Sequence, residues 1–176
     1  MKLLVIDMQK GLVVSDLYNK DKIVNNIIKL IDQARKNNVE VIYFKHDAGS
    51  GSGLTEGDDD FELFSLVEAK KDEKVYVKTI NSCFSVGEFR DYLESIDEKE
   101  LMIVGVQTEF CIDATIKSAF ERGFKVYVPS FTNSTFDNGY MKASKIYKFY
   151  NEWVWPGAFS ECITMKEALK LLRLNK

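Results

Sequence analysis

The chain has 176 residues, a net charge of −3 and an isoelectric point of about 5.3. This length suits a single domain spanning residues 1–176, which can bury a core without disulfides or a structural metal. The acidic balance offers no basic field for nucleic acid, and no apolar stretch approaches the ~20 residues that span a bilayer. We therefore expect neither a nucleic-acid partner nor a membrane partner.

Cysteine usage and the start of the sequence bear on the compartment. The cysteines are odd in number, at positions 83, 111 and 162, and the amino terminus begins with a strand pattern instead of a signal peptide. We expect a cytoplasmic protein with reduced thiols.

Short apolar runs typical of strands alternate with helical patterns along the chain. We predict helices around apolar positions with helical spacing at 23–34, 86–96, 112–119 and 165–172, and a less certain helix within 138–150. This alternation favours an α/β protein, a three-layer α/β/α Rossmann-like fold with a mostly parallel sheet of about six strands. The predicted strands lie at 2–6, 39–44, 74–77, 101–105, 124–128 and 160–163.

One long stretch, residues 48–60, lacks apolar periodicity. It is rich in glycine and serine and then acidic, and it follows a predicted strand. It could be a lid that closes over a substrate. A solvated loop is the alternative, because such segments gain little from ordering.

Three apolar runs each end near a residue that can do chemistry. Asp7 follows the first strand, Lys78 follows the third, and Cys111 lies shortly after the fourth. In a parallel sheet these groups all emerge at the carboxyl edge, where open α/β proteins bind their ligands. An acid, an amine and a thiol are therefore expected to meet at one edge.

Each of these residues also has a structural interpretation when taken alone. Cys111 lies where a helix start would stabilise a thiolate, yet it could be an inert buried thiol. Asp7 could be a desolvated proton acceptor or the cap of a turn, and Lys78 could be a solvated surface amine. Only their coincidence at strand ends favours a catalytic site.

These residues lie in motifs that together resemble the isochorismatase-like cysteine hydrolases. The motifs are VIDMQ at 5–9, VKTINSCF at 77–84 and GVQTEFCIDAT at 105–115. The resemblance implies a triad in which Cys111 attacks a carbonyl, Asp7 takes and returns the proton, and Lys78 orients Asp7 and favours the thiolate. It also implies a cis Val106–Gln107 peptide bond and an oxyanion hole formed by the backbone N–H groups of Gln107 and Cys111.

The sequence departs from the resemblance at the metal site. Nicotinamidases of this superfamily bind a metal through an aspartate and two histidines, whereas this chain has only His46. We expect no metal and no organic cofactor. His46 resembles a histidine that lines the pocket in several metal-free relatives, although it could instead be a non-functional histidine whose hydrogen bonds are satisfied. Isochorismatase itself hydrolyses a vinyl ether without a nucleophilic cysteine, so Cys111 favours the amidase branch.

Aromatic residues supply the remaining expectations. They could wall a small apolar substrate pocket or form a subunit contact, although aromatic residues are more often simply core. The segment 147–155 carries much aromatic surface, and proteins of the family that the motifs resemble are commonly dimers or tetramers. Together these observations predict a homo-oligomer, a dimer or a tetramer. The aromatic residues concerned in the pocket are Phe61, Phe110, Trp153 and Trp155.

The sequence thus predicts a cysteine hydrolase of a small amide, carbamoyl or ureido compound that acts through a thioester. One alternative is a nicotinamidase with an atypical or absent metal site. Another is a non-catalytic small-molecule binder, or a redox thiol protein, of the same fold.

Overall fold

A parallel sheet forms the middle layer of the molecule. In the computed structural model, which describes residues 1–174, the strand order is β3-β2-β1-β4-β5-β7, with β6 paired to β4. All pairings between these strands are parallel. The strands are β1 (Lys2–Ile6), β2 (Val41–His46), β3 (Lys74–Lys78), β4 (Glu100–Val106), β5 (Lys125–Pro129), β6 (Asn133–Ser134) and β7 (Glu161–Ile163).

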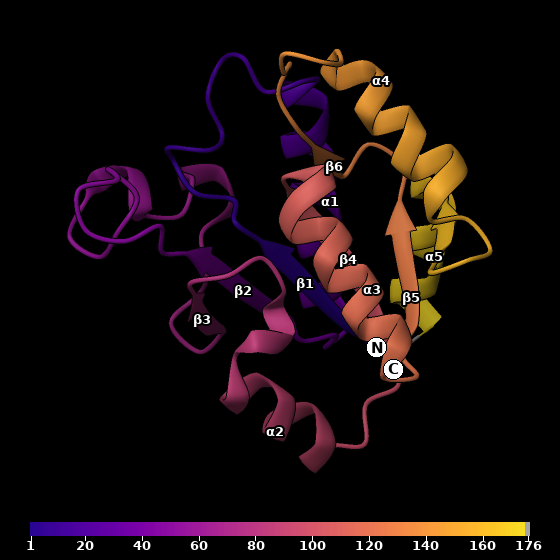
Figure 1. Cartoon of the computed structure of the whole chain (residues 1–176). Coiled ribbons are helices and arrows are strands. Elements are labelled where there is room, and N and C mark those ends of the chain that lie inside the picture. The colour runs from indigo at the N-terminus through magenta and orange to yellow at the C-terminus, as the bar shows by residue number, and fades with distance from the viewer. Residues whose placement is uncertain (175–176) are drawn as a thin grey trace.

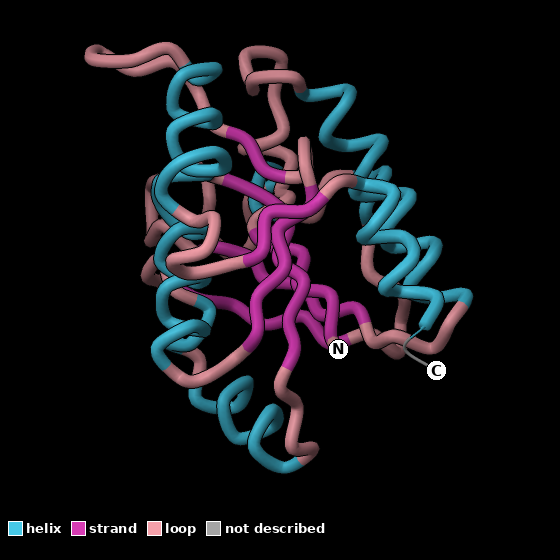
Figure 2. The backbone as a smooth tube through the Cα atoms, turned by 90° about the vertical axis from the view of Figure 1, so that its right-hand side faces the viewer, coloured by secondary structure: helices cyan, strands magenta, loops and turns pink. Residues whose placement is uncertain are grey.

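Helices cover both faces of the sheet, as Figure 1 and Figure 2 show. Helices α1 and α5 share one apolar core with the sheet, and α2 and α3 share the other. Helix α4 continues into a π-helical segment at Phe149–Val154. The helices are α1 (Lys20–Lys36), α2 (Gly87–Ser95), α3 (Asp113–Glu121), α4 (Ala143–Lys148) and α5 (Met165–Leu174).

Helix α1 illustrates why these segments are helical. Its apolar side chains recur every three or four residues, so that they form one stripe facing the sheet. Burying each large one stabilises the fold by about 1.5–3 kcal/mol. The helix ends at Asn37, whose N–H donates to the carbonyl of Ala34. The buried residues of this stripe are Ile23, Val24, Ile27, Leu30, Ile31 and Ala34.

The two central strands approach closely at the edge where the chemistry is expected. Ile6 of β1 pairs with Gly105 of β4. A side chain at position 105 would meet the Ile6 carbonyl oxygen at 1.9 Å, and φ there is +128°. Glycine is therefore required at this position. Because β1 is flanked by β2 on one side and β4 on the other, a crevice opens beyond their carboxyl ends.

The fold agrees with the expected three-layer architecture. All six predicted strands are present, with ends that lie within two residues of the predicted ones. The structure adds the short β6. The helix expected within 138–150 is present as α4, and its π-helical extension continues to Val154. None of the helices within residues 1–174 is long and apolar enough to cross a bilayer.

Candidate active site

Strand ends place three side chains side by side. Asp7 directly follows β1, and its N–H donates to the carbonyl of Phe44 on β2 at 2.9 Å. His46 and Lys78 are the last residues of β2 and β3 and are register partners. Asp7 and Lys78 are almost completely buried, with 1% and 2% of their surface exposed. The parallel register therefore brings the acid, the imidazole and the amine to one point.

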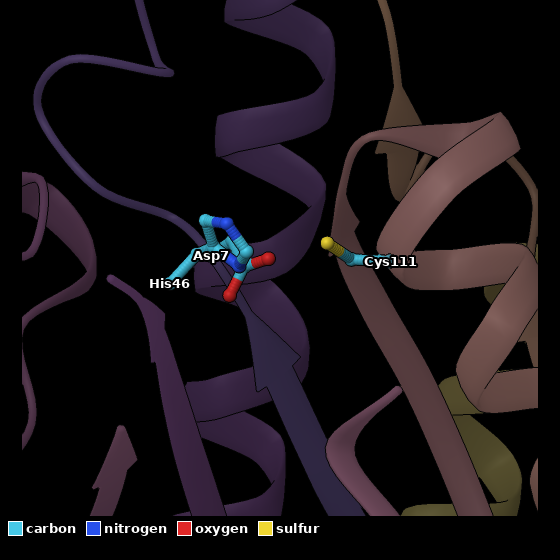
Figure 3. Close-up of side chains that lie close together, drawn as sticks. All are labelled: Asp7, His46 and Cys111. Atoms are coloured by element: carbon cyan, nitrogen blue, oxygen red, sulfur yellow. The ribbon is translucent and has the colours of Figure 1, made fainter. Parts of the chain in front are cut away.

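Cys111 reaches this point from the neighbouring strand. After β4 the chain passes through the cis Val106–Gln107 peptide bond, which the resemblance implied. It then forms a π-helical turn, Thr108–Ile112, that leads into α3. Single π-helical turns often occur at functional sites. Figure 3 shows the Cys111 sulfur facing the Asp7 carboxylate, with the His46 ring beside Asp7.

The Lys78 ammonium links the site. Its Nζ donates to Asp7 Oδ2 at 2.7 Å and to Cys111 Sγ at 3.2 Å, and it lies 3.3 Å from His46 Nδ1. The other Asp7 oxygen, Oδ1, is buried and has no hydrogen-bond partner within the described chain. One Asp7 oxygen is therefore held by Lys78, and the other is open to accept a proton.

Burial sets the ionisation of these groups. Desolvation raises the pKa of Asp7 above its ordinary value, although Lys78 opposes this shift. Desolvation opposes the charge on Lys78, but the Asp7 carboxylate nevertheless raises its pKa above the ordinary value. Asp7 is thus a base of increased strength beside a persistent cation.

The thiol differs from expectation. The sequence indicates that the helix start stabilises a thiolate at Cys111, and the resemblance implies that Lys78 favours it as well. Instead, burial and the Asp7 charge outweigh Lys78 and raise the pKa of Cys111 to about 12. The resting thiol is therefore protonated at neutral pH.

A cavity of about 140 Å³ opens onto these groups. Gln107 and Cys111 both line it, which is compatible with the oxyanion hole that the resemblance implies; that role stays a prediction. The lining residues are Asp7, Leu12, His46, Leu54, Asn81, Val106, Gln107, Phe110 and Cys111.

Two of the five predicted substrate-binding residues border this cavity. His46 and Phe110 line it. Trp155 is fully buried under α3, where its Nε1 donates to Asp113 Oδ1 at 2.9 Å. Phe61 is a core residue, and Trp153 is 77% exposed. The expectation that Phe61, Trp153 and Trp155 wall the pocket is not met at this cavity, because Phe61 and Trp155 are packed in the interior and Trp153 is mostly exposed to solvent.

Other residues at the site were not singled out from the sequence. Asn81 lines the cavity, and its Oδ1 accepts from Cys111 Sγ at 3.7 Å. Gln9 is buried beneath His46: its Oε1 accepts from the His46 N–H at 2.7 Å, and its Nε2 donates to the His46 carbonyl at 3.1 Å. Both lie within the quoted motifs. Leu54 brings the 48–60 loop to the cavity, but the lid role stays a prediction.

Three buried polar side chains support the π-helical turn Thr108–Ile112 that carries Cys111, which we call the cysteine turn. Thr108 Oγ1 donates to Asn133 Oδ1 at 2.8 Å. The amides of Asn133 and Asn151 donate to each other at 2.8 and 3.0 Å. Thr108 and Asn133 are fully buried, and 8% of Asn151 is exposed. These contacts connect the turn to β6 and to the π-helical segment that follows α4.

The residues at the site do not fit the metal centre of nicotinamidases. Possible ligand atoms of Asp7, His46 and Cys111 lie within 4.8 Å of one another. However, the Lys78 ammonium contacts all three side chains, and a bound cation would have to displace it. The sequence has no second histidine. A centre with an aspartate and two histidines cannot be built from these residues.

Curated proteins resemble this chain over most of its length. Nicotinamidase 3 of Arabidopsis thaliana is 30% identical over 150 residues, 77% of this chain and 73% of that protein. A streptothricin hydrolase of Streptomyces noursei is 28% identical over 137 residues, and the match covers 77% of this chain but only 54% of that protein. The chain therefore spans about half the length of that relative.

Solved structures share the fold. The crystal structure of an isochorismatase family protein has a TM-score of 0.84 at 30% identity, covering 92% of this chain and 96% of that chain. A cysteine hydrolase from Pseudomonas syringae pv. phaseolicola 1448A has a TM-score of 0.88 at 24% identity, covering 99% and 93% of the two chains. The family model described as the isochorismatase domain matches residues 2–148. This chain therefore belongs to the isochorismatase family.

Proposed function

We propose that this protein hydrolyses a C–N bond of a small amide, carbamoyl or ureido compound through a thioester on Cys111. One observation carries the proposal. Cys111 and Asp7 line a small cavity, the Lys78 ammonium donates to both, and one Asp7 oxygen has no hydrogen-bond partner within the described chain. A thiol, a base that can take its proton and a cation that holds the base are the parts that nucleophilic acyl transfer needs.

The reaction proceeds in two halves. Asp7 Oδ1 takes the Sγ proton as the sulfur attacks the substrate carbonyl carbon and forms the C–S bond. The C–N bond then breaks, and the leaving nitrogen receives that proton from Asp7. In the second half a water molecule gives a proton to Asp7 and attacks the thioester, and the C–S bond breaks as the sulfur regains a proton. Asp7 therefore acts as base and acid in turn.

Lys78 serves both halves. Its ammonium holds Asp7 Oδ2, which leaves Oδ1 directed at the reacting atoms. Its contact with Cys111 Sγ stabilises the negative charge that the sulfur carries after it loses its proton. A buried ion pair has little solvent to reorganise, so this electrostatic support is present before the substrate binds.

The cavity indicates the substrate class. Its walls include the apolar side chains of Leu12, Leu54, Val106 and Phe110, and its volume is about 140 Å³. The Lys78 charge is already matched by Asp7, and no other cationic side chain lines the cavity within the described chain. A compact, uncharged substrate suits this space better than a carboxylate.

Nicotinamide is a second candidate substrate because a nicotinamidase of Arabidopsis thaliana is 30% identical to this chain. Its hydrolysis here would have to proceed without the aspartate and two-histidine metal centre. Chelation would then leave turnover unchanged, whereas loss of activity on removal of a stoichiometric metal would favour an atypical metal site.

A screen for ammonia release tests the proposal. Small primary amides, carbamates and ureas, with nicotinamide included, are offered to the intact protein, to Cys111→Ala and to Cys162→Ala as a thiol control. We expect turnover of at least one compound by the intact protein and by Cys162→Ala, and none by Cys111→Ala. Turnover by Cys111→Ala would refute the thioester route. Binding without hydrolysis across the panel would favour a non-catalytic protein.

A further inference from the structure

The Lys78 ammonium has no unused hydrogen. An ammonium carries three N–H donors and no acceptor. Three potential acceptors surround Lys78 Nζ: Asp7 Oδ2 at 2.7 Å, Cys111 Sγ at 3.2 Å and His46 Nδ1 at 3.3 Å. Each hydrogen therefore has one partner, and Lys78 acts as a tripod that fixes all three side chains.

This tripod determines where the His46 proton lies. Because an ammonium can only donate, Nδ1 must present its lone pair to Lys78, and the ring proton must be on Nε2. The pKa of the His46 ring agrees with this assignment of the proton. Burial and Lys78 lower the pKa of His46, and they outweigh the opposite effects of Asp7 and Asp47. His46 is therefore a neutral imidazole with a fixed tautomer.

The main chain of His46 is fixed as well. The buried Gln9 amide accepts from the His46 N–H at 2.7 Å and donates to the His46 carbonyl at 3.1 Å. The imidazole is thus held at both ends, by Gln9 through the main chain and by Lys78 through Nδ1. Within the described chain Nε2 makes no hydrogen bond, and the residue lines the cavity. An unused N–H donor therefore borders the substrate space.

We propose that His46 is a specificity-determining residue whose Nε2–H donates to an acceptor atom of the substrate close to the scissile carbon. One of the two ring nitrogens of His46 lies within 4.8 Å of the Cys111 sulfur, and both residues line the same cavity, so the imidazole borders the reacting atoms. The acceptor is therefore an oxygen or nitrogen two bonds from the carbon that the sulfur attacks, distinct from the carbonyl oxygen and the leaving nitrogen. The inference deepens the proposed function and rests on it for the identity of the reacting carbon.

The tautomer can be tested without any substrate. His46 is the only histidine of the chain, so its ring signals need no assignment. We expect long-range ¹H–¹⁵N spectra of the intact protein to show an unprotonated Nδ1 and a protonated Nε2. At pH 6.5, where about half of a free imidazole is charged, the ring should still be neutral. A proton on Nδ1, or a charged ring at that pH, would overturn the proposal.

The substrate contact needs a matched pair of probes. 2-Methoxyacetamide and butanamide have similar shapes, but only the first carries an oxygen two bonds from the carbonyl carbon. Their dissociation constants are measured by NMR titration in the Cys111→Ala protein, where no turnover occurs. The same measurement follows in Cys111→Ala with His46→Leu and in Cys111→Ala with His46→Gln. Glutamine can accept from Lys78 and still donate into the cavity.

We expect 2-methoxyacetamide to bind about fivefold to tenfold more tightly than butanamide, the size of one net hydrogen bond. His46→Leu should abolish this preference, and His46→Gln should retain most of it. Equal affinities in the Cys111→Ala protein, including no measurable binding of either amide, would overturn the contact. Failure of the ammonia screen with the expected NMR results would instead count against hydrolysis alone.

Discussion

Asp7 combines two unfavourable features. Its φ is +52°, in the left-handed region that residues other than glycine seldom adopt, and within the described chain its Oδ1 is buried without a hydrogen-bond partner. Each feature destabilises a folded protein by roughly 1–3 kcal/mol. Such features persist where function requires them, and here they keep a proton acceptor beside Cys111.

The Asp7–Lys78 ion pair should be strongly coupled in stability. Side-chain exposure is 1% for Asp7 and 0% for Lys78, so loss of either partner leaves a buried group uncompensated. We expect Asp7→Asn and Lys78→Met each to lower the free energy of unfolding, by up to roughly 3–5 kcal/mol. The double variant should lose clearly less than the sum of the two. Urea unfolding of the four proteins measures this cycle, and additive losses would show that the pair is not coupled.

Alkylation of Cys111 should separate the charge of Asp7 from its role as a base. The Asp7 carboxylate raises the pKa of Cys111, whereas Lys78 lowers it. Asp7→Asn should therefore increase the rate of iodoacetamide labelling at pH 8 several-fold. In the intact protein the labelling rate should continue to rise above pH 8.5, since no resting thiolate is present.

Peptide mapping identifies the labelled cysteine in both proteins. Cys83 is fully buried, and burial raises its pKa still further, so it should not react. A labelling rate for Cys111 that is already maximal at pH 7 would restore the thiolate expectation and contradict the geometry.

At the scale of elements, the spacing of apolar residues in the sequence was sufficient to predict the buried strands and helices. The strand β6 could not be predicted, because it has two residues and lies in a polar run, Thr132–Thr135, that is completely buried. Polar sequence normally indicates solvent exposure. Here these side chains are buried because they bind the cysteine turn and neighbouring backbone groups.

The Thr108 contact provides a prediction for the cysteine turn. Thr108→Val keeps the shape but removes the donor to Asn133. We expect a loss of about 1 kcal/mol in unfolding free energy and a larger relative fall in kcat than change in KM, because the thiol would be less well positioned. Thr108→Ser retains the hydroxyl and should restore kcat. An equal loss of kcat in both variants would assign the effect to packing instead.

Some residues of the candidate site could likewise be predicted from the sequence, and others could not. Asp7, Lys78 and Cys111 were identified because the ends of parallel strands share one edge, a rule that requires no loop coordinates. The positions of Phe61, Trp153 and Trp155 depend on loops and on a π-helical segment, which residue type alone does not fix. Gln9 and Asn81 have no distinctive chemistry in sequence, and only tertiary contacts show their roles.

At the scale of the whole molecule, we propose that the chain self-associates. The region around α4 and the π-helical segment exposes large apolar side chains: Tyr140 is 98% exposed, Trp153 77% and Phe149 48%. Such groups are usually covered by a partner when they gather on one surface. We expect light scattering at micromolar concentration to give at least twice the 20.2 kDa monomer mass. Trp153→Lys should lower the mass, and a monomeric parent protein would contradict the proposal.

Single-domain organisation and a cytoplasmic location stay predictions of the sequence. Residues 1–174 include one sheet with helices on both faces, and the elements of the site come from β1, β2, β3 and the turn after β4. The site therefore depends on contacts between segments far apart in the chain. The site can therefore form only when these segments are folded together.

Turnover by Asp7→Asn tests the central claim most directly. The variant keeps the side-chain shape but cannot take the Cys111 proton, so with the best substrate of the ammonia screen we predict a fall in kcat of roughly 10²–10⁴-fold. Circular dichroism of the same sample confirms that it is folded. Near-parental turnover by the folded variant would contradict the account, because Asp7 would then not be the base.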